Sequence, residues 1–151
     1  MPNSYCGISI DAIKAIAVFK IGDKLFSLDL DYLTAFLFSS QETEKQVTVL
    51  PQENTVIYKG DFYRLINLHS FFGLKLKPRS GDTPLIAFEF AGHKGAFYAD
   101  SIEEIITFTR MVKDTVKVIP PANGGFDAGE LVVEGSAFII PDFKKIFAAV
   151  N

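Results

Sequence analysis

The side chains that could do acid–base or metal chemistry are few and scattered in this sequence. The two histidines, His69 and His93, lie far apart, and neither has a second histidine or a cysteine at ligand spacing. A zinc site takes about three or four such ligands. The single cysteine, Cys6, also excludes an internal disulfide. We therefore expect no metal ion and no cofactor.

Carboxylates and serines make no better case for catalysis. Asp100, Glu103 and Glu104 form the densest acidic cluster, but paired carboxylates divide acid and base roles only where burial separates their pKa values. Because most carboxylates are exposed, a solvated charged edge is favoured over a hydrolytic site at Asp100. No serine lies in a G-x-S-x-G elbow, and no glycine-rich loop matches a phosphate-binding pattern. The sequence predicts a protein that is not an enzyme.

Two isolated cations, Lys59 and Arg64, interrupt the most apolar stretch of the chain, residues 55–74. In one interpretation both point to solvent from half-exposed strands. In the other, a cation framed by apolar side chains marks a docking groove, since interfaces combine apolar anchors with a polar rim. The second interpretation predicts six partner-binding residues: Val56, Ile57, Tyr58, Lys59, Gly60 and Phe62.

The same stretch predicts a local fold. Two apolar runs flank a Gly-Asp pair at residues 60–61, which favours a β-hairpin with a tight turn there. A short helical turn should follow and end at Gly73, because glycine commonly closes a helix. Residues 55–74 are therefore expected to form a strand, a turn, a second strand and one turn of helix.

A similar hairpin is predicted near the start of the chain. Ala15–Ile21 is a continuous β-branched and aromatic run, which suits a strand covered on both faces. Gly22-Asp23 makes the turn, and Lys24–Leu30 alternates apolar and polar side chains, as a half-buried strand does. The shared Gly-Asp start is consistent with repeated hairpins in a barrel, although strands in general look alike.

Many further short apolar runs predict a mostly β protein. The expected strands are Val47–Leu50, Pro84–Phe90, Gly95–Ala99, Val116–Ile119, Leu131–Val133 and Ala137–Ile140. One helix is expected after Pro141, because Phe143, Ile146, Phe147 and Val150 recur at helical spacing. Many strands with one C-terminal helix favour a barrel-like class.

The segments between these strands carry four further expectations. Asp31 should cap a helical turn over residues 33–37. Residues 39–45 are polar without periodicity and should form a surface loop. Residues 75–82 contain proline and glycine and should separate two lobes. Residues 100–106 fit a capped helical turn or a bent strand equally well.

Composition bounds the class of protein. A chain of 151 residues makes one domain or two small lobes sharing a core. Its 48% hydrophobic content, with 15 phenylalanines and no tryptophan, predicts a dense core or exposed apolar patches. Residues 1–13 are expected to form an extension that packs loosely or is disordered. Residues 14–151 are expected to form a single domain of two lobes.

Charge and hydropathy limit the partners and the location. The formal net charge is −3 and the cations are scattered, so we expect no nucleic-acid partner. No stretch approaches the roughly 20 apolar residues that span a bilayer, and the first residues lack the pattern of a signal peptide. We expect a cytoplasmic protein that does not insert into a membrane.

The order of these elements resembles a CheW-like domain, the coupling module of bacterial chemosensory arrays. The resemblance runs from about Ala15 to about Phe147. Four segments carry it: 18–30, with an aromatic residue, a Gly-Asp turn and an alternating strand; 58–73, similar to the family's Asn-Leu-Arg-Gly and Asp-Leu-Arg region; 95–105, similar to its glycine, hydrophobic, Val-Asp pattern; and 138–147, similar to its closing strand and helix.

This resemblance implies a fold and a function. The implied fold is two intertwined SH3-like five-stranded β-barrel lobes with a short C-terminal helix. The implied function is a non-catalytic adaptor that couples a methyl-accepting chemoreceptor to a CheA-type histidine kinase through hydrophobic docking grooves. The residues of this chain that match the family's Asn-Leu-Arg-Gly segment are Ile57-Tyr58-Lys59-Gly60.

The chain departs from the family pattern in this central segment. Lys59 stands where the family has arginine, which keeps the charge but loses the planar bidentate fork. Arg64 stands where proline is common, and Asn67 and His69 replace the aspartate and arginine of Asp-Leu-Arg. Two alternatives therefore remain: a diverged CheW-like protein that serves motility or pilus signalling with a different partner, and a small-molecule-binding or sensing β-barrel whose phenylalanines line a pocket.

Overall fold

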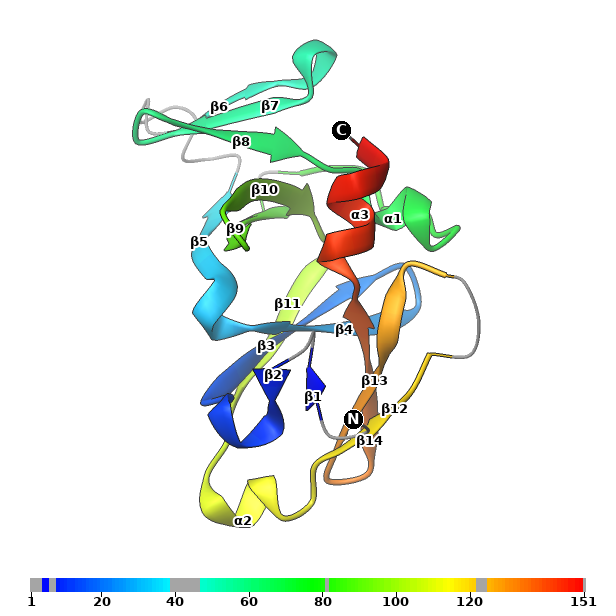
Figure 1. The fold of residues 1–151 in the computed structure, drawn as a ribbon. Helices are drawn as coiled ribbons and strands as arrows, with labels where there is room; N and C mark the ends of the chain where they lie inside the picture. The colour runs from blue at the N-terminus through cyan, green and yellow to red at the C-terminus, as the bar shows by residue number, and fades with distance from the viewer. Residues whose placement is uncertain (1–3, 6–7, 39–46, 81, 122–124, 151) are drawn as a thin grey trace.

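Two curled β-sheets form the body of the protein (Figure 1). The computed structural model describes residues 4–5, 8–38, 47–80, 82–121 and 125–150. The predictions for Cys6 and for the surface loop at residues 39–45 concern residues outside these ranges. Among the described residues, no helix is long and apolar enough to cross a bilayer.

One sheet is built from the two ends of the chain, and we call it the terminal sheet. Its strand order is β11-β3-β4-β14-β13-β12. The strands are β3 (Ala15–Ile21), β4 (Lys24–Asp29), β11 (Ser101–Thr107), β12 (Lys117–Ile119), β13 (Asp127–Val133) and β14 (Ser136–Pro141). A parallel contact of β14 with β4 joins the C-terminal hairpin to the N-terminal one.

The other sheet is built from the middle of the chain, and we call it the middle sheet. Its strand order is β5-β9-β10-β8-β7-β6. The strands are β5 (Leu33–Phe38), β6 (Val47–Leu50), β7 (Thr55–Tyr58), β8 (Asp61–Leu65), β9 (Pro84–Phe90) and β10 (His93–Tyr98). The mostly β class and the two intertwined lobes are confirmed, with six strands in each sheet where five were expected.

Short elements connect and cover the sheets. The helices are α1 (Leu68–Phe71), α2 (Arg110–Lys113) and α3 (Phe143–Val150), and short 3-10 helices span Ile10–Ala12, Leu30–Tyr32 and Pro51–Glu53. Two short strands, β1 (Ser4–Tyr5) and β2 (Ile8–Ser9), pair with each other. The expected loose packing of residues 1–13 does not hold at Ile13, which is fully buried in the core of the terminal sheet.

An aromatic cluster lies between the sheets, and we call it the central cluster. Phe19 of the terminal sheet stacks on its cross-strand neighbour Phe26 at 5.4 Å between ring centroids. It also meets Phe97 of the middle sheet at 5.1 Å. Phe97 in turn contacts Phe88 at 5.6 Å. A chain of ring contacts therefore runs from one sheet into the other.

Strands β3 and β9 are buried on both faces, which explains their continuous apolar sequences. In β3, Ile16 and Val18 enter the core of the terminal sheet, while Phe19 and Ile21 enter the central cluster. In β9, Ile86 and Phe88 enter the central cluster, while Leu85 and Ala87 enter the core of the middle sheet. Side chains alternate between the two faces of a strand, so each strand supplies two cores. The prediction for Ala15–Ile21 is confirmed.

Helix α3 closes the central cluster with the predicted stripe. Phe143, Ile146 and Phe147 are buried against it, and Phe88 meets Phe143 at 4.3 Å between centroids. Gly95 makes room for the contact of Phe88 with Phe147, 5.7 Å between centroids, since an added Cβ would lie 2.8 Å from Phe88 Cζ and 2.9 Å from Phe147 Cζ. Pro141 is the last residue of β14 and not in the first helical turn, and the backbone N–H of Lys145 donates to the Asp142 carboxylate at 3.1 Å.

The chain crosses between the sheets twice. It leaves the terminal sheet after Asp29, through the 3-10 helix into β5, and it returns between β10 and β11 at Asp100. The expected break at residues 75–82 is wrong, because that loop joins α1 to β9 and the strands on either side of it belong to the middle sheet. The two crossings lie at Asp29, which is buried, and at Asp100, which accepts hydrogen bonds, and not at the proline and glycine of residues 75–82.

Two local expectations also change. The helical turn expected over residues 33–37 is strand β5, which pairs with β9, and the capping residue is Asp29, whose carboxylate accepts from the backbone N–H of Asp31 at 3.0 Å. Residues 101–107 form the bent strand and not the helical turn, with a register shift between Ile102 and Glu104. Non-local pairing overrides the local helical pattern at residues 33–37.

Asp100 ties the returning crossing to the β3–β4 turn and to the loop between α1 and β9. Its Oδ2 accepts from the backbone N–H of Gly22, in the β3–β4 turn, at 2.8 Å. Its Oδ1 accepts from the backbone N–H of Lys77 at 2.8 Å. The acidic cluster therefore contains one structural carboxylate, while Glu103 and Glu104 are exposed, as a solvated edge requires.

Replacing Asp100 with asparagine should destabilise the protein by about 1–3 kcal/mol, because one backbone N–H would then face an amide NH2 in place of an acceptor. The free energy of unfolding measured in urea tests this. The matched control is Glu104→Gln on the exposed edge, which should change it by less than about 0.5 kcal/mol. Equal effects of the two variants would contradict the assigned role.

Stability should depend on pH through Asp29, which is 1% exposed. Burial raises the pKa of its carboxyl, more than the hydrogen bond from Asp31 lowers it. The folded pKa therefore lies above the unfolded value of about 3.9. The contribution of Asp29 to stability is complete below the unfolded pKa and is lost as the pH rises through the folded pKa.

Asp29→Asn keeps the capping oxygen and cannot ionise, so it should remove this loss. The variant should gain stability over the original protein as the pH rises from about 4 to about 7. Urea unfolding of both proteins across that range measures the difference. A difference that stays constant with pH would refute the assignment.

Candidate docking surface

The hairpin of β7 and β8 carries the predicted partner-binding residues. Its register pairs Val56 with Tyr63, Ile57 with Phe62, and Tyr58 with Asp61. The turn is therefore Lys59-Gly60 and not the Gly60-Asp61 pair that the sequence favoured. Both turn residues have positive φ, 50° and 80°, as a type I′ turn requires.

The two faces of this hairpin differ sharply. Val56 and Tyr63 face the core of the middle sheet, with 0% and 4% of their surface exposed. Ile57 and Phe62 occupy the opposite face, where Ile57 is partly exposed and Phe62 is 68% exposed. Val56 was predicted to bind a partner, and its burial excludes it from direct contact. Ile57 and Phe62 lie opposite each other and form the apolar centre of what we call the hairpin face.

Phe62 is exceptional among the aromatic residues. All 15 phenylalanines of the chain lie within the described ranges, and Phe62 is the one that is exposed. The others are buried in the cores or packed partly against them. A fully buried phenylalanine side chain stabilises by roughly 1.5–3 kcal/mol, and Phe62 gains little of this in the isolated chain.

Charged groups border the apolar pair. Lys59 lies with its Nζ 5.3 Å from the centroid of the Tyr58 ring, within cation–π range. Next to the turn, Lys94 Nζ lies 3.4 Å from Asp61 Oδ1, and both side chains are substantially exposed. An exposed pair of this kind contributes about 0–1 kcal/mol. The ion pair lies on the core side of the hairpin, since Asp61 alternates with Phe62 and Lys94 Nζ lies 5.8 Å from the centroid of the Tyr63 ring, so it is not part of the hairpin face.

Arg64 lies on the same face as Phe62, two residues along β8. It pairs with Thr55 of β7 and with Gly95 of β10. Its Nε is buried and has no hydrogen-bond partner within the part of the chain that the structure describes. Arg64 is partly exposed and Lys59 is exposed, so exposure alone does not decide between the solvent-facing and docking interpretations of these two cations.

The remaining exposed apolar side chains lie elsewhere. Ile105, Met111 and Ile119 are 45%, 82% and 49% exposed. They belong to β11, α2 and β12, all at the terminal-sheet end of the molecule (Figure 1). Met111 is more exposed than Phe62 and sits on a short helix, which makes it a useful control for the hairpin face.

The histidines do not form a site together. His93 lies in β10, where its ring stacks on Phe147 at 5.0 Å. His69 lies in α1, and burial lowers the pKa of its imidazole, while the Asp100 charge opposes that shift. Within the described ranges no group of three His, Cys, Asp or Glu residues is arranged to hold a metal ion.

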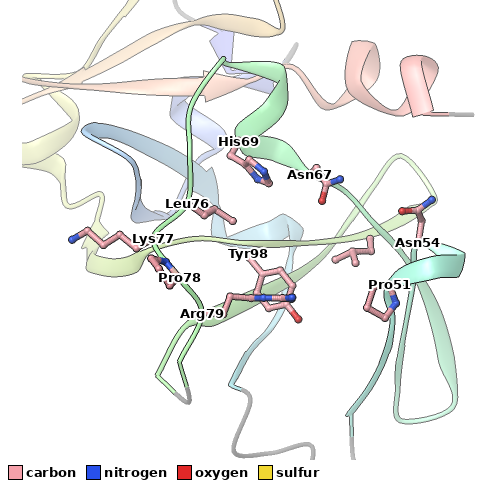
Figure 2. Close-up of a pocket in the computed structure, with 10 residues that line it drawn as sticks. Pro51, Asn54, Asn67, His69, Leu76, Lys77, Pro78, Arg79 and Tyr98 are labelled. Atoms are coloured by element: carbon pink, nitrogen blue, oxygen red, sulfur yellow. The ribbon is translucent and has the colours of Figure 1, made fainter.

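A pocket of about 410 Å³ lies between β8, α1, β10 and the segment 76–79 (Figure 2). Its lining consists of Pro51, Asn54, Leu65, Asn67, His69, Leu76, Lys77, Pro78, Arg79 and Tyr98. No phenylalanine contributes to it. The expectation that phenylalanines line a binding pocket is wrong for this one, because the phenylalanines fill the cores.

The shared central cluster and the double crossing define a two-sheet, barrel-like β domain. The chain belongs to the CheW-like domain family, whose model matches residues 15–151. This is a family of non-catalytic chemotaxis scaffolds and adaptors, whose members generally couple receptors to the CheA kinase. The family resemblance read from the sequence is confirmed.

A solved structure agrees on the fold. The chain is similar to the scaffolding protein TtCheW from Thermoanaerobacter tengcongensis, with 22% sequence identity and a TM-score of 0.63. The match covers 85% of this chain and 88% of the other. None of the curated proteins compared with the chain matches it.

The variant Lys59→Asn removes the charge at the turn but should keep the turn geometry. Asparagine tolerates positive φ better than lysine, so the variant should be as stable as the original protein or more stable by up to about 1 kcal/mol. Thermal or urea unfolding measures this. Lys59→Val, a β-branched residue that resists positive φ, is the comparison and should destabilise; the reverse order would refute the turn geometry.

Proposed function

We propose that the protein is a non-catalytic adaptor of a bacterial chemosensory system, which docks a signalling partner on the hairpin face. The partners it fits are a CheA-type histidine kinase and the signalling tip of a methyl-accepting chemoreceptor, as in other members of the family. Its place of work is the cytoplasm, where such kinases and receptor tips lie.

The exposure of Phe62 carries this proposal. A large apolar side chain, set opposite Ile57 and bordered by Lys59 and Arg64, has the anatomy of an interface hot spot with a polar rim. The hairpin is also rigid, because its inner face is anchored by Val56 and Tyr63 in the core of the middle sheet. A preformed surface loses little conformational entropy on binding.

The departures from the family pattern bear on the choice of partner. Lys59 offers a point charge where the family's arginine offers a planar fork, so it favours a single carboxylate over a bidentate pair. Arg64 brings a second cation to the same face. A partner with acidic residues around an apolar centre would complement both. This favours a diverged member, with a kinase or receptor of its own system, such as one for motility or pili.

Phe62→Ala should weaken binding of the cognate kinase or receptor fragment by about tenfold. The two-thirds of the side chain now exposed to water corresponds to about 1–2 kcal/mol of burial. Isothermal titration with a CheA-type kinase from the same genome measures the effect. The stability of the variant should change little, because Phe62 is mostly exposed before binding.

Met111→Ala is the matched control. It removes a more exposed apolar side chain at the other end of the molecule and should leave the affinity within about twofold, since it lies outside the proposed interface. Equal losses in the two variants would contradict docking on the hairpin face. Failure of every CheA-type kinase and receptor fragment from that genome to associate with the chain would contradict the adaptor function itself.

A further inference from the structure

The pocket between β8 and the segment 76–79 has a chemistry that docking on the hairpin face does not use. Its volume of about 410 Å³ falls in the range of small-ligand sites. One part of its lining is apolar, from Pro51, Leu65, Leu76 and Pro78, and the rest is amide, imidazole, phenol and cationic groups. No carboxylate belongs to the lining.

Arg79 is the cation placed to meet a ligand. Its guanidinium lies over the Tyr98 ring, 4.5 Å from the centroid, and Figure 2 shows it reaching across that ring toward the pocket. Stacking on the ring face holds the guanidinium plane while leaving its N–H edge free. The side chain of Lys77, two residues earlier, points away from the pocket in the same view.

The opposite side of the pocket offers neutral polar groups. Asn67 and His69 point toward the pocket from the start of α1, and Asn54 faces it from the turn before β7 (Figure 2). Burial lowers the pKa of the His69 imidazole, against the opposing effect of the Asp100 charge, which favours the neutral form. Of the two cations in the lining, Lys77 and Arg79, Arg79 is the one turned toward the pocket, and the amides and imidazole can supply hydrogen bonds.

The backbone around the pocket is held in place. The N–H of Leu74 donates to the carbonyl of His69 at 2.9 Å, and that of Gly73 to Ser70 at 3.3 Å, which is the Schellman closure of a helix. Lys77 is tied to Asp100. Leu65 N–H donates to the Asn54 carbonyl at 2.8 Å. The walls are thus fixed before a ligand arrives, which reduces the entropic cost of binding.

We infer that this pocket binds a carboxylate carried on a compact apolar or aromatic body. A guanidinium edge pairs with a carboxylate by two parallel hydrogen bonds, and the apolar lining accepts the body of the ligand. The carboxylate could come from a free organic acid or from the C-terminal residue of a peptide. These two sources share the same chemistry and are separated by the experiment.

The experiment titrates the full chain, labelled with 15N, with three small probes and follows the backbone amide signals of Asn67, His69 and Tyr98. Benzoate should shift them saturably. Acetate, which lacks the body, and benzamide, which lacks the charge, should each bind at least fivefold more weakly. Equal responses to benzoate and benzamide, or no saturable response to any probe, would overturn the inference.

Variants then test the role of Arg79. Arg79→Gln should weaken benzoate binding at least fivefold, whereas Lys75→Gln, which removes an equal charge from the same loop outside the pocket lining, should change it less than twofold. Both side chains are exposed, so an unchanged amide spectrum outside the pocket confirms that each variant folds. Equal losses of affinity in the two variants would show that the effect comes from long-range electrostatic attraction, and would refute the site.

A last arm identifies the source of the carboxylate. N-acetylated Gly-Phe with a free C-terminus is compared with its C-terminal amide and with benzoate. If the free-acid dipeptide binds at least tenfold tighter than benzoate, the site takes a peptide terminus; if benzoate binds as well or better, it takes a free organic acid. The dipeptide amide binding as tightly as the free acid would contradict carboxylate recognition. These readouts are independent of kinase or receptor binding, so they stand or fall separately from the adaptor function.

Discussion

The contact between Phe19 and Phe97 packs the terminal sheet directly against the middle sheet. Each sheet has a core of its own, but neither core includes α3, which packs only against the central cluster. Offset and edge-on aromatic pairs contribute about 0.5–1.5 kcal/mol beyond the area they bury. A run of such pairs through Phe19, Phe97, Phe88 and Phe143 therefore fixes the sheets and the helix relative to one another. The rigidity of both proposed binding surfaces rests on this cluster.

Both surfaces draw on β8 and the residues that follow it. Phe62 and Arg64 lie on its outer face, Tyr63 and Leu65 face inward, and Asn67 begins the turn into α1. Leu65 contributes to the pocket lining as well as to the core of the middle sheet. The strand alternation thus distributes one short segment among a core, a docking face and a pocket. This explains why the stretch is mostly apolar yet carries isolated polar side chains.

The sequence predicts elements well where a local pattern decides the structure. The apolar run Ala15–Ile21 and the stripe of α3 each determine their own burial, and both are confirmed. The helical turn predicted over residues 33–37 is wrong because this segment pairs with β9, which lies far along the chain, whereas the local spacing favours a helix. The structural role of Asp100 could not be predicted for the same reason, because its two hydrogen-bond donors, Gly22 and Lys77, come from other parts of the sequence.

The sequence predicts only part of the candidate docking surface. Alternation groups Ile57 with one face and Val56 with the other, but it does not say which face the curled sheet turns inward. That is decided by packing against β5 and β9, which leaves Phe62 outside and Val56 inside. The predicted turn, Gly60-Asp61, is one residue later than the observed turn, Lys59-Gly60. The sequence favoured the later position because lysine at positive φ is uncommon and the Gly-Asp pair resembles that of the first hairpin. No local sequence pattern predicts the pocket, because its lining comes from four separate segments of the chain.

The double crossing of the chain has a consequence for how the protein folds. The terminal sheet cannot close until the whole middle sheet has been synthesised, because the ties Gly22–Asp100 and Ser27–Ile139 span 78 and 112 residues. Closing such long loops costs entropy before the aromatic contacts repay it, and chains rich in distant contacts fold in roughly milliseconds to seconds. Until Phe97 and the strands of residues 101–141 have been made, the phenylalanines of β3 and β4 lack partners that bury them in the folded protein. The newly made chain is therefore most prone to aggregate in the interval before residues 101–141 arrive.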